Sequence, residues 1–151
     1  GRAKAVSISA AIELGKRMRF SEPIEARQFS SSEAVAQDFM VTMSNLKQEE
    51  FWIVLLNKAN KEIGRYRIST GGISSAQVDN RIVLKYAIEN LATNIILIHN
   101  HPSGNLNPSR DDLNLTKNII TCCKPFDISV LDHIIIGNKR YLSFSEEGYL
   151  I

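Results

Sequence analysis

Two apolar runs, each too short for a typical helix, constrain the fold of this chain most. They are FWIVLLN at residues 51–57 and NIILIHN at residues 94–100. Runs of this length that are rich in β-branched and aromatic residues are typical of strands, and the second has the pattern of a buried strand. The first is followed by a turn, NKAN, and by the alternating segment EIGRYRIS at 62–69. Together these two segments predict an antiparallel hairpin.

Segments with helical periodicity separate the strands. Ser30 and Glu33 are three residues apart and have the pattern of a capping box, which predicts a helix from about Ser31 to Leu46. A stretch around Pro23, residues 20–29, is typical of a linker. The remaining predicted elements are helices over 1–19, 80–91 and 109–124 and strands over 127–137 and 140–144. This order predicts one α/β domain from residue 25 onwards, a mixed central β-sheet flanked by helices, preceded by a short N-terminal helix.

Composition excludes some classes of function. The net charge is only +2, with both signs mixed along the chain, so the sequence lacks the basic footprint of a dedicated DNA-binding domain. No apolar run is long enough to cross a bilayer, and the first residues lack the pattern of a signal peptide, so we expect a cytoplasmic protein without a membrane partner. Cys122 and Cys123 are adjacent and ill placed for a disulfide, which favours reduced thiols packed in the core.

The segment HNHPSGNLNPSRDD, residues 99–112, has the composition of a metal site. Side chains alternate along a strand, so His99 and His101 leave the same face, about 7 Å apart at the backbone. A Gly/Pro loop then returns the chain and places Asp112 in the first turn of the next helix. Two imidazoles and a carboxylate suit zinc with a fourth position left for water. Each residue also has an ordinary structural interpretation, since strand-end histidines are common and Ser109 with Asp112 forms a capping motif.

The spacing of these residues resembles the signature of the JAMM (MPN-plus) metalloprotease family. That signature is H-x-H, seven residues, then S-x-x-D, and it matches at His99, His101, Ser109 and Asp112. The segments HNHPSG, FWIVLLN and LDHIIIG resemble the RadC-like branch, and the resemblance covers residues 25–145. It implies a JAB/MPN-type fold, similar to the α/β/α fold of cytidine deaminases, for a domain spanning 25–151.

The same resemblance implies a zinc-dependent hydrolase, a peptidase or isopeptidase that uses a metal-activated water. His99, His101 and Asp112 would be the metal ligands and Ser109 would support the oxyanion. The general base of the family is an upstream glutamate, which predicts Glu49, with Glu50 as the alternative.

Two further residues have an expected place near this site. His133, in LDHIIIG, is expected beside the ion rather than on it, with Asp132 orienting its ring.

The N-terminal segment supports an alternative function. Residues 1–20 resemble the C-terminal remnant of a helix-hairpin-helix, a module that RadC-like proteins carry and that grips DNA. This resemblance leaves two alternatives beside the hydrolase, a DNA-associated repair or processing protein and a non-catalytic binding module. The substrate and the oligomeric state stay open.

Overall fold

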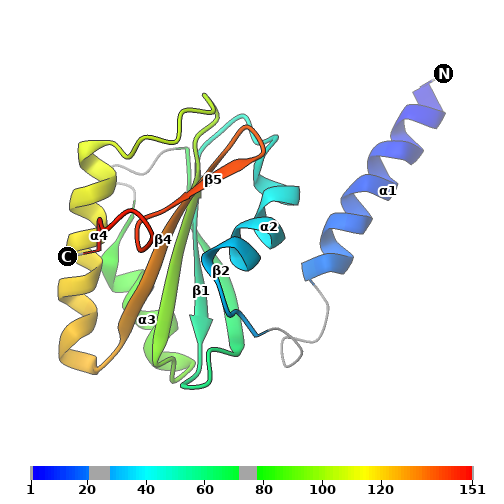
Figure 1. The fold of residues 1–151 in the computed structure, drawn as a ribbon. Helices are drawn as coiled ribbons and strands as arrows, with labels where there is room; N and C mark the ends of the chain where they lie inside the picture. The colour runs from blue at the N-terminus through cyan, green and yellow to red at the C-terminus, as the bar shows by residue number, and fades with distance from the viewer. Residues whose placement is uncertain (1, 21–27, 72–77, 151) are drawn as a thin grey trace.

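The computed structural model describes residues 2–20, 28–71 and 78–150. The expected α/β class with a mixed central sheet and an N-terminal helix is confirmed (Figure 1). In chain order the elements are α1 (Arg2–Phe20), α2 (Ser32–Met43), β1 (Glu50–Leu56), β2 (Glu62–Thr70), α3 (Asn80–Glu89), β3 (Asn94–Asn100), α4 (Arg110–Cys123), the short 3₁₀ helix η2 (Lys124–Phe126), β4 (Ser129–Gly137) and β5 (Arg140–Ser143).

The five strands form one sheet in the order β2-β1-β3-β4-β5. β1 pairs antiparallel with both β2 and β3, which confirms the predicted hairpin. β3 and β4 are parallel, and α4 is the crossover between them. β5 returns antiparallel through a tight turn whose central residues, Asn138 and Lys139, both have positive φ, as a type I′ turn requires. The predicted apolar runs are therefore β1 and β3, two of the three inner strands.

Helices cover both faces of the sheet (Figure 1). On one face, α3 and α4 bury apolar side chains against alternate residues of the inner strands: Phe51, Ile53, Leu55, Ile95, Leu97, Val83, Ala87, Leu115, Ile119 and Cys123. On the other face, α2 packs on the intervening residues: Val35, Ala36, Phe39, Met43, Val54, Leu56, Ile96, Ile98, Ile134 and Ile136. Burying both faces explains why these strands are apolar throughout rather than alternating.

The start of α2 differs from the prediction by one residue. Ser31, with extended backbone, is the N-cap and its hydroxyl accepts from the backbone N–H of Ala34. Glu33 instead accepts from the side chain of Gln37, so the predicted reciprocal pair with Ser30 does not form. Three consecutive serines offer similar caps, and the hydroxyl of Ser32 is hydrogen-bonded to that of Ser143 in β5 at 3.2 Å.

The N-terminal helix α1 has exposed apolar side chains. Within it Val6, Ile8, Ile12 and Leu14 are each more than half exposed. Residues 21–27 of the predicted linker over 20–29 lie outside the described residues. Among the helices that the structure describes, none is both long enough and apolar enough to pass through a bilayer.

Candidate metal centre

The end of β3 sets the direction of the two histidines. The β1–β3 pairing ends with His99 opposite Phe51. The two rings are stacked, with their centroids 6.3 Å apart. His101 follows two residues later on the same face, and its backbone N–H donates to the carbonyl of Ile136 in β4. His99 is fully buried, whereas the His101 side chain keeps 11% of its surface exposed. The pair is therefore open to solvent only on the His101 side.

The loop after His101 brings the chain back across the end of the sheet. Gly104 has a φ of 78°, and Gly137 lies so close to it that a Cβ on Gly137 would come within 3.1 Å of the Gly104 Cα. Glycine at both positions lets the loop pack directly on β4. The loop ends at Ser109, from which α4 begins.

Asp112 performs two tasks with its two carboxylate oxygens. Its Oδ2 accepts from the backbone N–H of Ser109 at 2.6 Å, and the Ser109 hydroxyl accepts from the backbone N–H of Asp112 at 3.1 Å. The predicted capping motif is therefore present. Asp112 is nonetheless fully buried, and its Oδ1 has no hydrogen-bond partner among the residues that the structure describes. That oxygen is directed towards the histidines, so the cap and the predicted ligand role are compatible.

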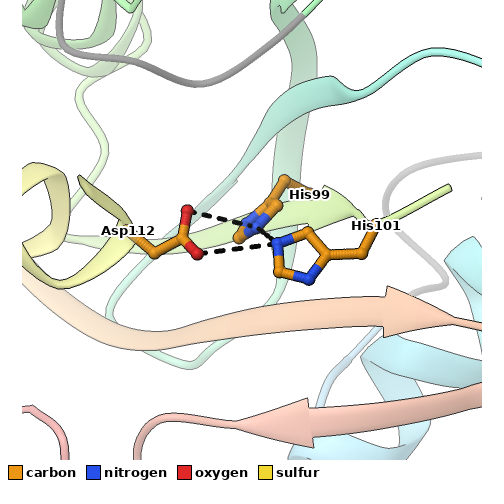
Figure 2. Close-up of side chains that lie close together, drawn as sticks. All are labelled: His99, His101 and Asp112. Atoms are coloured by element: carbon orange, nitrogen blue, oxygen red, sulfur yellow. Dashed lines mark hydrogen bonds and ion pairs between the residues drawn. The ribbon is translucent and has the colours of Figure 1, made fainter. Parts of the chain in front are cut away.

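Three side chains converge on one point (Figure 2). The Nε2 atoms of His99 and His101 are 2.9 Å apart, and each lies 3.5 Å from an oxygen of Asp112. Bonds of 2.0–2.1 Å in tetrahedral geometry separate neighbouring zinc ligands by about 3.3 Å. The measured distances are close to this separation, with His99 near Oδ1 and His101 near Oδ2, so the three side chains could hold one ion.

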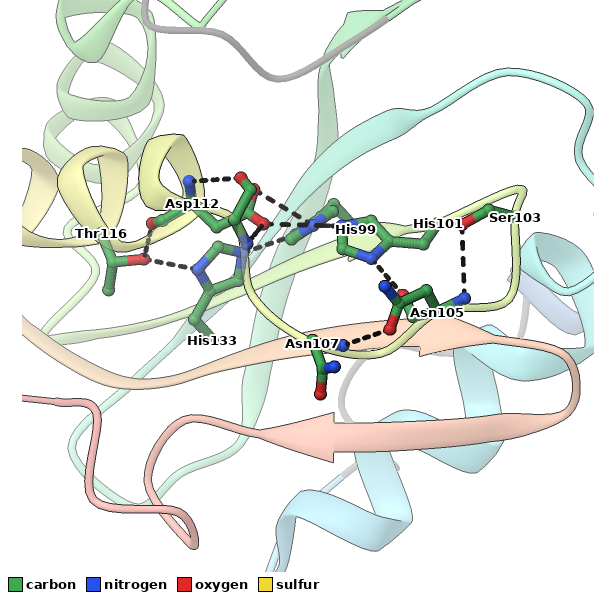
Figure 3. Close-up of polar contacts among 9 residues, drawn as sticks. His99, His101, Ser103, Asn105, Asn107, Asp112, Thr116 and His133 are labelled. Carbon is green, nitrogen blue, oxygen red and sulfur yellow. Dashed lines mark hydrogen bonds and ion pairs between the residues drawn. The ribbon is translucent and has the colours of Figure 1, made fainter.

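The hydrogen bonds of His101 leave its Nε2 available to an ion. Its Nδ1 contacts the backbone carbonyl of Asn105, which only accepts, so Nδ1 carries the proton and Nε2 of the neutral ring has a lone pair (Figure 3). Burial acts to lower the pKa of His101, but the contacts with Asp112 and Asn105 and the charge of Glu49 raise it. The groups around His101 therefore favour a positive charge next to its ring.

The surroundings keep His99 neutral and Asp112 ionised. Burial lowers the pKa of His99 well below its ordinary value, and the charge of His133 adds to this. Burial alone would raise the pKa of Asp112, but the hydrogen bond with His101, the charge of His99 and the hydrogen bonds with Ser109 lower it. Both groups are therefore in the protonation state that a metal ligand needs.

His133 lies directly behind His99. Its Nε2 is 2.7 Å from His99 Nδ1, and its Nδ1 is 2.6 Å from the hydroxyl of Thr116 (Figure 3). Burial lowers the pKa of His133 to about 3. The sequence analysis expected His133 near the site but did not identify Thr116. Thr116 lies one helical turn after Asp112 and so shares its face of α4.

The prediction that Asp132 orients the His133 ring is wrong. The Asp132 carboxylate accepts from the backbone N–H of His133, from the hydroxyl of Ser143 and from the backbone N–H of Ser145. Asp132 therefore holds residues 143–145 in place. The two ring nitrogens of His133 have other partners, His99 and Thr116.

The two candidate bases lie on opposite faces of the sheet. Glu50 accepts from the indole N–H of Trp52 at 2.8 Å and pairs with Arg67 at 3.0 Å. Trp52 packs with α2, away from the histidines. Glu49 alternates with Glu50 and so shares the face of Phe51, and the β1–β3 register continued by two residues sets it opposite His101.

The asparagine between the two histidines holds the backbone on either side of Glu49. The side chain of Asn100 accepts from the N–H of Glu50 at 2.8 Å and donates to the carbonyl of Gln48 at 3.0 Å. Asn100 is buried, on the face opposite to its neighbours. The sequence analysis did not single it out, because an amide inside a ligand motif has no distinctive pattern.

Ser109 is exposed at the start of α4. Its hydroxyl oxygen accepts from the backbone N–H of Asp112, and the hydroxyl also interacts with the Asp112 carboxylate, whose pKa it lowers. The position is consistent with the predicted support of an oxyanion beside the three converging side chains.

Comparison with known proteins identifies similar chains. A family model described as RadC-like JAB domain matches residues 29–149. A UPF0758 protein of Flavobacterium johnsoniae is 45% identical over 148 residues, which are 98% of this chain and 65% of the relative. UPF0758 proteins of Caldanaerobacter subterraneus and Streptococcus suis are 44% and 40% identical, over 99% and 100% of this chain and 64% and 61% of their own lengths. The chain therefore spans less than two thirds of the length of these curated relatives.

Proposed function

The chain belongs to the RadC-like JAB domain family, and we propose that it is a zinc-dependent hydrolase acting on peptide or isopeptide bonds. One observation carries the proposal. The Nε2 atoms of His99 and His101 lie 3.5 Å from Oδ1 and Oδ2 of the buried Asp112 carboxylate, respectively, and Oδ1 has no hydrogen-bond partner among the described residues. A buried acceptor left unpaired is unfavourable, so the arrangement calls for a cation.

The donor set favours zinc. Two neutral imidazoles and one carboxylate are a common ligand set of catalytic zinc sites, in which a fourth position is open. The same set also suits ferrous iron, so the metal is part of what must be tested. Zinc bound by these residues would act as a Lewis acid. It would lower the pKa of a bound water to about 7, which would make a nucleophile available at neutral pH.

The surrounding residues have complementary roles in the proposal. Glu49, half-buried on the open side near His101, takes a proton from the attacking water and passes it to the leaving nitrogen. Ser109 donates its hydroxyl proton to the oxygen of the substrate carbonyl as negative charge develops there. His99 and Asp112 are held rigidly by burial, which keeps the site in place during the reaction.

Metal content is the first test. Protein purified without chelator, stripped and then titrated with zinc is expected to bind one equivalent, whereas His99→Ala is expected to bind none tightly. Ferrous iron and manganese are titrated in parallel. Failure of zinc to bind, or stronger binding of iron, would contradict the proposal.

The adjacent acids provide a matched pair for testing catalysis. On a peptide and isopeptide library, Glu49→Gln is expected to lower turnover by about 10²-fold or more, the usual contribution of a general base, while still binding zinc. Glu50→Gln changes the neighbouring acid on the opposite face and is expected to retain turnover. Equal activity of Glu49→Gln and wild type would reject the assignment of the base.

A further inference from the structure

We infer that the hydroxyl of Thr116 fixes which nitrogen of His133 and of His99 carries a proton, and so holds the Nε2 lone pair of His99 ready for the metal. Thr116 is thus a positioning residue that acts through two imidazoles. The inference rests on the proposed metal site but requires no particular reaction.

Two oxygens next to His133 must share one proton. The Thr116 hydroxyl oxygen lies 2.6 Å from the backbone carbonyl oxygen of Asp112, one turn earlier in α4. A carbonyl oxygen only accepts, and two oxygens this close repel each other unless a hydrogen lies between them. The single hydroxyl proton of Thr116 is therefore committed to Asp112.

That commitment determines the protons on both rings (Figure 3). Thr116 is left as an acceptor towards His133 Nδ1, 2.6 Å away, so Nδ1 of His133 must carry the proton. In the neutral ring Nε2 is then unprotonated and accepts from His99 Nδ1 at 2.7 Å. His99 therefore carries its proton on Nδ1, and its Nε2 presents a lone pair to His101 and Asp112.

Burial prevents water from replacing any member of this chain of contacts. Thr116 is 2% exposed, and His133 and His99 are fully buried. In this buried setting the neutral ring of His133 has one protonated nitrogen and one acceptor. Reversing the chain would leave two oxygens facing each other without a proton and would place a proton on His99 Nε2, where the ion has to bind.

The backbone of the loop after β3 fixes the protonated nitrogen of His101 in a similar way. His101 Nδ1 donates to the Asn105 carbonyl, so its Nε2 also presents a lone pair. The two Nε2 atoms, 2.9 Å apart, then face each other with lone pairs on both. Two backbone carbonyls, of Asp112 and Asn105, thus set the protons of the whole group, the first of them by way of Thr116.

The experiment uses the fact that the chain has only three histidines. Nitrogen-15 NMR of the zinc-free protein resolves which ring nitrogen of each is protonated. We expect His99 and His133 to be protonated on Nδ1 alone. Thr116→Val, which has the same shape but no hydroxyl, is expected to lose this fixed pattern and to bind zinc about 10 to 100 times more weakly, as is usual when an outer partner of a ligand is removed. Thr116→Ser is the matched control and is expected to behave as wild type.

Several outcomes would overturn the inference. A wild-type spectrum with the proton on Nε2 of either His99 or His133 would do so without any variant, even if Thr116→Val does not fold. Unchanged zinc affinity in a folded Thr116→Val would also reject it. Neither measurement uses a substrate, so zinc binding with the expected protons but without hydrolysis would leave this inference intact and count against the proposed function alone.

Discussion

Replacing Asp112 by asparagine should make the metal-free protein more stable and the zinc-treated protein less stable than wild type. The amide oxygen of asparagine is expected to keep the hydrogen bond from the Ser109 backbone N–H, because only the oxygen can accept it. The amide nitrogen then takes the position of Asp112 Oδ1, which lacks a hydrogen-bond partner in the described part of the chain. There it lies 3.5 Å from Nε2 of His99, to which it can donate.

The magnitude follows from the cost of the unpaired oxygen. A buried acceptor without a partner costs about 1–3 kcal/mol, so Asp112→Asn should raise the free energy of unfolding of the metal-free protein by about 1 kcal/mol. In a domain of this size that raises Tm by about 2–4 °C. Zinc at one hundred times its Kd stabilises a protein that binds it by about 2.7 kcal/mol, and the variant should gain none of this.

Thermal unfolding followed by circular dichroism, with chelator and then with zinc, measures both effects. The order of Tm should reverse between the two conditions. The comparison is made at pH 8.5, because a proton on His101 would be attracted to the wild-type carboxylate and would mask the effect. A metal-free variant clearly less stable than wild type would refute the reasoning about the unpaired oxygen, and a full zinc-induced rise in Tm would refute the ligand role of Asp112.

Two further predictions concern the same region. In the presence of chelator, the free energy of unfolding should fall as the pH is lowered from 7.5 to 5.5, because the unfolded chain protonates His133 near pH 6.5 whereas burial lowers the folded pKa to about 3. Below pH 6.5 His133 alone contributes about 1.4 kcal/mol per pH unit, with His99 acting in the same direction, and urea unfolding curves that coincide at the two pH values would contradict this. Asn100→Ala should retain zinc but lower turnover about tenfold, because the backbone around Glu49 loses both of its side-chain hydrogen bonds. Metal analysis together with kcat measures this effect, and turnover equal to wild type would show that the amide does not position the base.

The fold could be predicted closely because local patterns and tertiary packing agree in this chain. Residues 51–56 and 95–98 of the two predicted runs are all apolar, and the structure packs helices against both of their faces. The convergence of His99, His101 and Asp112 was also predictable, since strand alternation and a returning loop leave little freedom at the end of β3. Their role as ligands, the assignment of Glu49 and Ser109, and the helix-hairpin-helix remnant at 1–20 stay predictions.

What could not be predicted depends on contacts between distant elements. Three consecutive serines precede or begin α2, and the partner of the Ser32 hydroxyl is Ser143 in distant β5, which local pattern cannot indicate. The partner of the His133 ring is Thr116 of α4 rather than the adjacent Asp132, because the parallel pairing of β3 and β4 sets the ring under that helix. The sequence analysis expected Asp132 to contact the ring because it is adjacent to His133. Adjacent side chains of a strand point to opposite faces of the sheet, so the two do not meet.

The alternation within the tripeptide His99-Asn100-His101 has a consequence for how such a chain can vary. Its outer side chains converge with Asp112 and its middle side chain is hydrogen-bonded to the backbone of Gln48 and Glu50, so opposite faces of one short segment serve different tasks. Inserting or deleting one residue in β3 would exchange those faces and remove both tasks at once. Homologous chains should therefore accept many substitutions around this segment but almost no change in its length.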